Sequence, residues 1–183
     1  MMNGMPPHCG SLMFQGKSQV ALCEPLAQLA REHEPLTEQM NAFAREAESI
    51  GAEETREDWT GPLNELRAKV EAYAHDLDVH SDKEEVHLFP LMAKYIGRET
   101  GPIAVMEYEH ETGKRLIARF LEEVSSLSGT TPADKAKEIA SIALNAYEIL
   151  TSHFMKEENV LFPMAESMLN EEEKEQMRRG VME

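Results

Sequence analysis

Two segments constrain the fold most strongly, because each places ionisable side chains on what otherwise reads as the buried face of a helix. They are HSDKEEVHLFP at residues 80–90 and HFMKEENVLFP at residues 153–163. A four-residue step returns to nearly the same helix face about 6 Å further along the axis, so each segment aligns a histidine with a glutamate. The chain must therefore fold so that two matching polar pairs are accommodated in its interior.

Apolar side chains recur at alternating three- and four-residue steps along four stretches, which is the pattern of amphipathic helices. The stripes run over residues 22–50, 63–87, 103–127 and 139–164, and a shorter helix is expected at 171–179. Four long helices with short connections favour an all-α, up-down-up-down four-helix bundle with a short peripheral C-terminal helix.

Prolines mark several expected helix limits. Pro62 and Pro102 each follow a glycine and suit a first helical turn, and Thr131 reads as the N-cap of the fourth helix. Pro90 and Pro163 are expected to break or kink the second and fourth helices near their ends.

The length of 183 residues suits one domain with a full core. We expect a flexible leader, a single bundle and an acidic C-terminal segment, at residues 1–18, 19–168 and 169–183. The leader contains His8 and Cys9, which could bind a metal, but its Gly/Pro-rich composition favours a tail without a site.

The composition excludes several classes of partner and location. A formal net charge of −16 would repel nucleic acid and anionic membrane surfaces. The sequence has only two cysteines, no secretory signal pattern, and no stretch approaching the ~18 apolar residues that span a bilayer. We therefore expect a cytoplasmic protein with neither a nucleic-acid nor a membrane partner; no particular protein partner is indicated.

The two halves of the sequence resemble each other. REHEPL at residues 31–36 is similar to YEHETG at 108–113, and each precedes one of the two HxxxE segments. His33 and His110 thus add single nitrogen donors from the first and third helices. An internal duplication of a helix hairpin predicts two equivalent ligand sets that meet at the centre of the bundle.

The resulting constellation favours a metal site with two ions. Its members are four histidines and two glutamates on the buried stripes: His33, His80, Glu84, His110, His153 and Glu157. No basic residue on these stripes neutralises the two carboxylates, whose burial would otherwise cost several kcal/mol. Four imidazoles and two bridging carboxylates provide eight donor atoms, and an oxo or hydroxo bridge would leave each ion one open position. Nitrogen and oxygen donors without thiolate favour iron, with manganese or zinc as alternatives.

The order H…HxxxE…H…HxxxE, with FP at 89–90 and 162–163, resembles the hemerythrin-like (HHE cation-binding) domain over about residues 20–165. The resemblance implies that the six residues ligate a non-haem di-iron centre, with Glu84 and Glu157 as bridges. Oxygen-carrying hemerythrins have a second histidine where this chain has Lys114, and an aspartate where it has Glu157. The chain is more similar to bacterial four-histidine, two-glutamate members.

Three further positions allow two interpretations each. His87 lies on the stripe of His80 and could be a proton relay, or a histidine at the wetter end of the bundle. Gly113 could open a pocket beside one metal ion, or permit close helix packing. Glu107 could be an occasional ligand, although a surface role is favoured.

These features predict a di-iron protein that binds, senses or detoxifies O₂, NO or related oxidants such as peroxide. The alternatives are an iron-trafficking or iron–sulfur-centre repair factor, or an enzyme that reduces peroxide or NO. Repair proteins of this family usually carry an additional cysteine-containing N-terminal domain, for which the leader has no room, and this disfavours the repair role. No catalytic residue can be assigned from the stripes, so whether the protein is an enzyme stays open.

Overall fold

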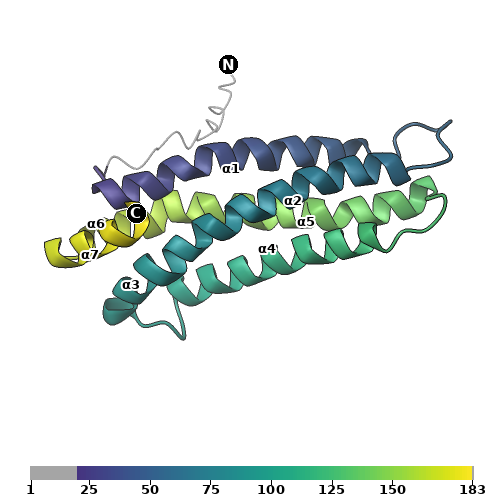
Figure 1. Ribbon diagram of the computed structural model, residues 1–183. Coiled ribbons are helices and arrows are strands. Elements are labelled where there is room, and N and C mark those ends of the chain that lie inside the picture. Colours follow the sequence, from purple (N-terminus) through teal and green to yellow (C-terminus); the bar gives the residue numbers. More distant parts are fainter. Residues whose placement is uncertain (1–19, 183) are drawn as a thin grey trace, which may run out of the picture.

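The computed structural model describes residues 20–182, which form helices joined by short connections (Figure 1). The body of the molecule consists of four long helices: α1 (Glu24–Ser49), α2 (Thr60–Lys83), α4 (Pro102–Ser125) and α5 (Ala133–Lys156). The shorter elements are two π-helices and three α-helices: η1 (Glu84–Leu88), η2 (Glu157–Leu161), α3 (Phe89–Ile96), α6 (Phe162–Met168) and α7 (Glu171–Met182). The predicted all-α class is confirmed for these residues.

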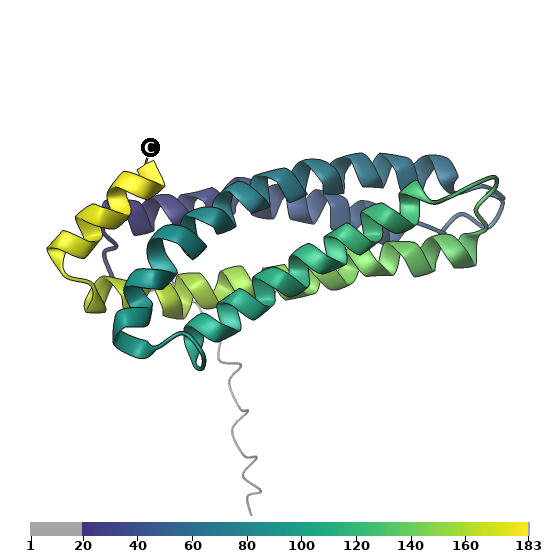
Figure 2. The same ribbon diagram turned by 60° about the horizontal axis from the view of Figure 1, so that its bottom comes forward.

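The long helices form a four-helix bundle. α1 packs against α2 and α5, and α4 packs against the same two helices. Their axes lie alongside one another in two views, and successive connections lie at alternating ends (Figures 1 and 2). α3, α6 and α7 gather at one end (Figure 2). This arrangement confirms the bundle with a short extra helix that the apolar stripes predict.

The second and fourth long helices pass through a π-helical turn just before their prolines. The amide of Phe89 donates to the carbonyl of Glu84, a bond that spans five residues, and η2 makes the equivalent bond. Pro90 and Pro163 follow these wider turns; in an ordinary helix each would crowd the carbonyl four residues back. The expected break is therefore a π-turn, after which the helix continues as α3 or α6.

The π-turns also move two residues away from the core. A constant helical period places His87 and Val160 on the buried stripes, and for Val160 this prediction is wrong, because its side chain is 51% exposed. Leu88 and Leu161 are buried instead. His87 is half-buried against Gly180 of α7, whose lack of a Cβ makes room for the imidazole ring. One additional residue in the turn shifts the buried face by roughly 100°.

Two apolar clusters, separated by one polar layer, fill the bundle. The larger cluster includes Phe43, Tyr73 and Phe120. The smaller cluster, which includes Leu29 and Phe89, extends toward α3, α6 and α7. Each fully buried large apolar side chain contributes about 1.5–3 kcal/mol, so the clusters on both sides stabilise a bundle whose middle is polar.

The two ends of the bundle are closed in different ways. Trp59 is buried where the connections 50–59 and 126–132 meet. Its backbone N–H donates to the carbonyl of Thr131 at 2.9 Å. Thr131 is not the N-cap of α5 as expected; Pro132 holds that position, and the Thr131 hydroxyl bonds to another threonine. At the opposite end α7 packs against α1 and η1 and buries Met177 and Val181.

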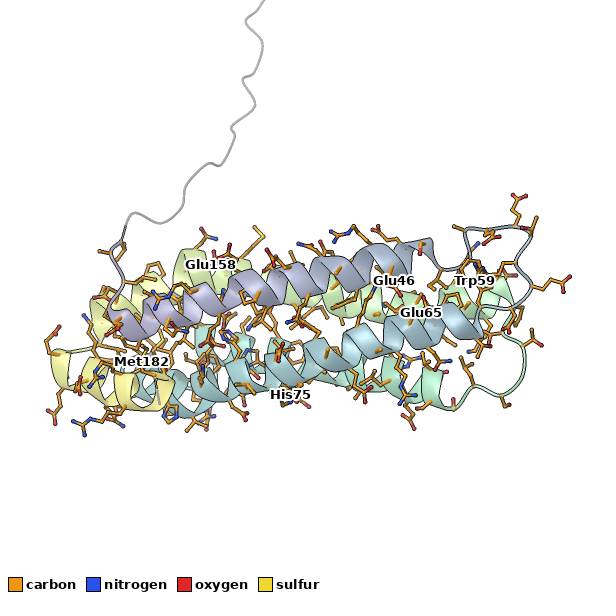
Figure 3. The ribbon with its side chains drawn as sticks, turned by 45° about the horizontal axis from the view of Figure 1, so that its top comes forward. Glu46, Trp59, Glu65, His75, Glu158 and Met182 are labelled. Atoms are coloured by element: carbon orange, nitrogen blue, oxygen red, sulfur yellow. The ribbon has the colours of Figure 1, made fainter. Side chains whose placement is uncertain are left out.

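Charged side chains cover the outer faces of the helices along the whole bundle (Figure 3). Exposed pairs such as Lys135 with Glu138, at 3.1 Å, each contribute only about 0–1 kcal/mol. Across residues 20–182, no helix combines the length and apolarity needed to cross a bilayer.

Candidate metal centre

Six ionisable side chains meet in the polar layer between the two apolar clusters. They are one histidine from each long helix and the first residue of each π-helix: His33, His80, His110, His153, Glu84 and Glu157. Each of the six is at most 2% exposed. The structure thus brings together all the residues that the sequence analysis proposes as ligands.

The six residues form two overlapping groups of four, in each of which the potential ligand atoms lie within 4.8 Å of one another. His33 and His80 belong to one group, and His110 and His153 belong to the other. Both glutamates belong to both groups. Each half of the chain therefore provides the histidines of one group, and the two carboxylates are shared between the groups.

The buried carboxylates lack hydrogen-bond partners. Within the described residues, both oxygens of Glu84 and of Glu157 are unpartnered, as is Nε2 of His110 and of His153. These atoms are nevertheless close: Nε2 of His153 lies 3.1 Å from Oε1 of Glu157, without hydrogen-bond geometry. Two uncompensated carboxylates in an apolar bundle would cost several kcal/mol each, so the layer fits positively charged ligands such as metal cations.

The histidine rings are held so that their Nε2 atoms point inward. Nε2 of His33 lies 3.1 Å from Nε2 of His80, so at most one proton can occupy the space between them. Phe154 stacks on His33 with ring centroids 4.2 Å apart, and Phe89 stacks on His110 at 5.7 Å. This packing restricts ring rotation and preorganises the nitrogens.

Each histidine also contacts a glutamate through its outward nitrogen, Nδ1. The four pairs are His33 with Glu158 at 3.0 Å, His80 with Glu32 at 3.0 Å, His110 with Glu85 at 2.8 Å, and His153 with Glu109 at 3.3 Å. We call these four glutamates the outer carboxylates. A carboxylate that accepts the Nδ1 proton fixes the tautomer whose Nε2 lone pair is free for a metal.

Lysines accompany three of the outer carboxylates: Lys83 bonds Glu32, Lys156 bonds Glu109, and Lys114 lies 3.8 Å from Glu85. Over residues 20–182, Glu158 has no lysine or arginine partner and pairs only with His33. The apolar stripes do not reveal the outer carboxylates. A signal for them exists, because each is the direct sequence neighbour of a proposed ligand in both copies of the duplication.

The carboxylates perturb the titration of the histidines in the metal-free protein. Burial lowers the pKa of His33, but the nearby Glu157 and Glu158 outweigh this effect and raise the pKa to about 9. Burial likewise opposes protonation of His153, whose pKa is raised to about 10 by Glu157 and Glu109. Burial raises the pKa of Glu32, yet hydrogen bonds from His80 and Lys83 bring it down to about 2. Glu32 therefore stays ionised at neutral pH.

Residues 24–165 match the protein-family model of hemerythrin, described as the hemerythrin HHE cation binding domain. The match covers most of the chain and includes all four long helices. The chain belongs to the hemerythrin HHE family. The expected resemblance is thereby confirmed.

Curated relatives of this hemerythrin-family chain include iron-sulfur cluster repair proteins named YtfE. The protein from Musicola paradisiaca is 33% identical over 141 residues, which are 74% of this chain and 61% of the relative. The protein from Salmonella schwarzengrund is 29% identical over 139 residues, 75% of this chain and 62% of the relative. The chain thus spans about three fifths of the length of these relatives. No solved structure gave a significant match.

The remaining positions singled out in this hemerythrin-family sequence lie outside the polar layer. Glu107 pairs with Arg98 at the surface, as favoured. A Cβ at Gly113 would come 2.7 Å from Leu150, so this glycine permits close packing and opens no pocket. His87 contacts α7 instead of the donor groups. His8 and Cys9 lie outside the described residues.

Proposed function

We propose that the protein holds two iron ions between its four buried histidines and two buried glutamates, and binds O₂, NO or a related oxidant at that centre. One observation carries the proposal: both donor groups share the same two carboxylates, whose four oxygens have no hydrogen-bond partner among the described residues. Two shared carboxylates offset much of the charge of two cations, which a single cation would not require.

The donor chemistry supports iron over a structural zinc ion. The groups contain imidazole nitrogens and carboxylate oxygens, and no thiolate from the described part of the chain, residues 20–182, takes part in either. Closed structural zinc sites are usually rich in sulfur, whereas mixed histidine and carboxylate sets in helical bundles favour iron. Manganese and zinc are the alternatives. Iron held by these residues would supply a site where a diatomic ligand could coordinate and accept electrons.

The protein's own residues supply orientation and exclusion of water. The outer carboxylates hold the Nδ1 protons, and therefore present the Nε2 lone pairs to the centre. Buried leucines and phenylalanines on both sides keep the layer out of bulk water. Small apolar diatomic molecules can cross such packing far more easily than ions can, which suits a centre that handles O₂ or NO.

A second function is the delivery of iron for repair of iron–sulfur centres, and the printed name of the relatives favours it. A helical bundle whose histidines carry raised pKa values could exchange metal ions for protons. Because the chain spans only about three fifths of those relatives, this role remains the second candidate.

The primary test is to purify the protein anaerobically, measure its metal content and follow its optical spectrum as O₂ or NO is added. We expect two iron ions per chain and a spectral change that saturates with the diatomic ligand. A folded protein that binds no iron under these conditions would contradict both proposed functions. Rapid turnover of peroxide would indicate an enzyme.

A reactivation assay then separates the two candidates. The iron-loaded protein is mixed with an enzyme whose iron–sulfur cluster has been damaged by NO. Recovery of that enzyme, together with stoichiometric loss of iron from this protein, would favour repair. A stable, reversible ligand spectrum without iron loss would favour binding or sensing.

A further inference from the structure

Glu158 differs from the other outer carboxylates in its surroundings. Its side chain is 49% exposed, whereas those of Glu32 and Glu109 are 19% and 15% exposed. Each of those two is covered by a lysine. Among residues 20–182 Glu158 has only His33 as a charged partner. Glu158 is therefore the most exposed of the outer carboxylates, Glu85 being 35% exposed, and among these residues its only charged partner is a proposed ligand.

A cavity of about 600 Å³ lies beside this carboxylate. Seven polar residues line it and define what we call the His33 mouth: Arg31, His33, Glu34, Thr37, Glu38, Glu158 and Asn159. The other cavities next to outer carboxylates are smaller, about 200 Å³ beside Glu32 and about 290 Å³ beside Glu109. The His33 mouth is thus the largest of these three cavities; it reaches His33, and the smaller cavity beside Glu32, which Lys83 also lines, reaches His80. In Figure 3, Glu158 lies nearer to Met182, the last residue of α7, than to Trp59.

The corresponding position in the second half is closed by positive charge. Thr37 and Glu38 follow His33 by four and five residues, and their counterparts after His110 are Lys114 and Arg115. Lys114 lies 3.8 Å from Glu85 and 3.3 Å from Asp78. A cation that approached His110 would meet this lysine, whereas one that approached His33 would meet three carboxylates, those of Glu34, Glu38 and Glu158, against the single positive charge of Arg31.

Beyond the mouth lies a destination suited to a cation. His33 is 2% exposed, and its Nε2 lies 3.3 Å from Oε2 of Glu157, an oxygen without a hydrogen-bond partner. A cation that moves from Glu158 past the His33 ring would reach both Nε2 of His33 and this oxygen of Glu157. Glu158, His33 and Glu157 therefore form a continuous sequence of oxygen and nitrogen ligands from the surface to the centre.

We propose that divalent cations reach and leave the buried centre through the His33 mouth, with Glu158 as the carboxylate that receives them and Thr37 as the position that keeps the path open. This inference rests on the proposed metal centre and adds the route by which its metal ions enter and leave. Negative charge at a concave site raises the local concentration of cations and speeds their association. The second half, capped by Lys114, serves to hold its histidine without admitting ions.

The test compares two variants that each add one lysine to the full-length chain. Thr37→Lys copies the lysine of the second half into the His33 mouth, and Thr112→Lys places the same charge at the cavity beside Glu109. Metal-free protein is mixed with Fe²⁺ under anaerobic conditions in a stopped-flow instrument, and release is measured with a chelator. Circular dichroism and final metal content confirm that each variant folds and loads.

We expect Thr37→Lys to slow uptake and release by a similar factor, about tenfold or more, while the final metal content stays at the wild-type value. Thr112→Lys should keep both rates within about twofold of wild type. Equal rates in wild type and Thr37→Lys, or equal slowing in both variants, would overturn the path. A wild-type protein that binds no metal would instead overturn the proposed function.

A second pair of variants separates the path from the orientation of the histidines. Glu158→Gln and Glu85→Gln each weaken one contact to Nδ1, so both should lower metal affinity. Only Glu158→Gln should also slow uptake by several-fold. Slower uptake in Glu85→Gln than in Glu158→Gln would place the path beside His110 and contradict the proposal.

Discussion

Residues 24–96 and 102–168 each supply two histidines, one glutamate that begins a π-turn and two outer carboxylates, yet the residues that follow His33 and His110 by four and five positions differ in charge. Lys114 of the second half lies 3.8 Å from Glu85, whereas Thr37, its counterpart in the first half, lines the cavity beside Glu158 and adds no charge there. α7 adds to the difference, because it packs on η1 and leaves Val160 of η2 exposed. The ligand sets inside a duplicated bundle can thus stay symmetric while the surface residues around them differ in charge and in function.

The largest expected effect tests whether the halves share their carboxylates. Because Glu84 belongs to both donor groups, Glu84→Ala should lose both metal ions together, and Glu157→Ala should do the same. Elemental analysis of the purified variants measures the metal content per chain. His33→Ala and His110→Ala provide the matched controls, since each removes a residue of one group only. Loss of a single ion from Glu84→Ala would contradict the shared arrangement.

The next effect is the pH dependence of the free energy of unfolding, to which each half contributes one histidine with a raised pKa. In the metal-free protein the pKa of His33 is raised to about 9 and that of His153 to about 10, above the ordinary value of 6.5. The folded state therefore binds more protons, and the stabilisation is present below about pH 6.5 and is lost as pH rises toward 10. The pKa of Glu157 is lowered, so stability should also fall below about pH 4.5.

Chemical denaturation at a series of pH values, with chelator present, measures this dependence. We expect a maximum of the free energy of unfolding between about pH 4.5 and 6.5, with a fall of a few kcal/mol above it. The metal-loaded protein should show the opposite trend between pH 5 and 7, because protons compete with the metal for the histidines. A metal-free protein whose stability rises steadily from pH 6.5 to 9 would show that the histidines are neutral.

A smaller effect tests whether the outer contacts of the two halves are equivalent. Glu32 and Glu109 occupy matching positions, and each is bonded by a histidine and a lysine. Glu32→Gln and Glu109→Gln should each weaken metal binding by about 10- to 100-fold. Competition with a chelator of known affinity measures the change. If the two values differ by more than tenfold, the symmetry of the interior is weaker than the contacts indicate.

The smallest effect concerns the packing of Gly113, whose counterpart in the first half is Leu36. An alanine Cβ would come 2.7 Å from Leu150, and the resulting displacement should outweigh the gain in helix propensity. We expect Gly113→Ala to lower the free energy of unfolding of the metal-free protein by about 1 kcal/mol. Gly61→Ala is the control, because a Cβ there meets no atom within 4 Å. Stabilisation by Gly113→Ala would show that Leu150 moves freely.

The helical periodicity predicts the bundle and brings six polar residues to one level, because burial along a straight helix follows directly from spacing. The outer carboxylates escape this reasoning. Glu85 and Glu158 are one residue beyond a proposed ligand, a rotation of about 100° that reads as a solvated face. Their contacts with His110 and His33 depend on how neighbouring helices are rotated, which spacing within one helix does not specify.

The same reasoning fails beyond Glu84 and Glu157 for a different reason. A constant period places Val160 in the core, but the π-turns bury Leu88 and Leu161 instead. Pro90 and Pro163 give the only local signal in the sequence. They indicate that the helix is interrupted, but they do not indicate that the interruption is a π-turn. Thr131 shows the same limit, because its hydroxyl bonds to Thr60, the first residue of α2, and does not cap α5.

The two π-turns also bear on how such a chain can change over evolutionary time. Deleting one residue from 84–88 would restore an ordinary helix and swing everything that follows by roughly 100°, turning the phenylalanine that packs on His110 away from it. The connections 50–59 and 126–132 carry no such requirement, because they lie at the far end of the bundle. Insertions and deletions should therefore collect in these connections, while the five-residue turns keep their length as strictly as the ligands keep their identity.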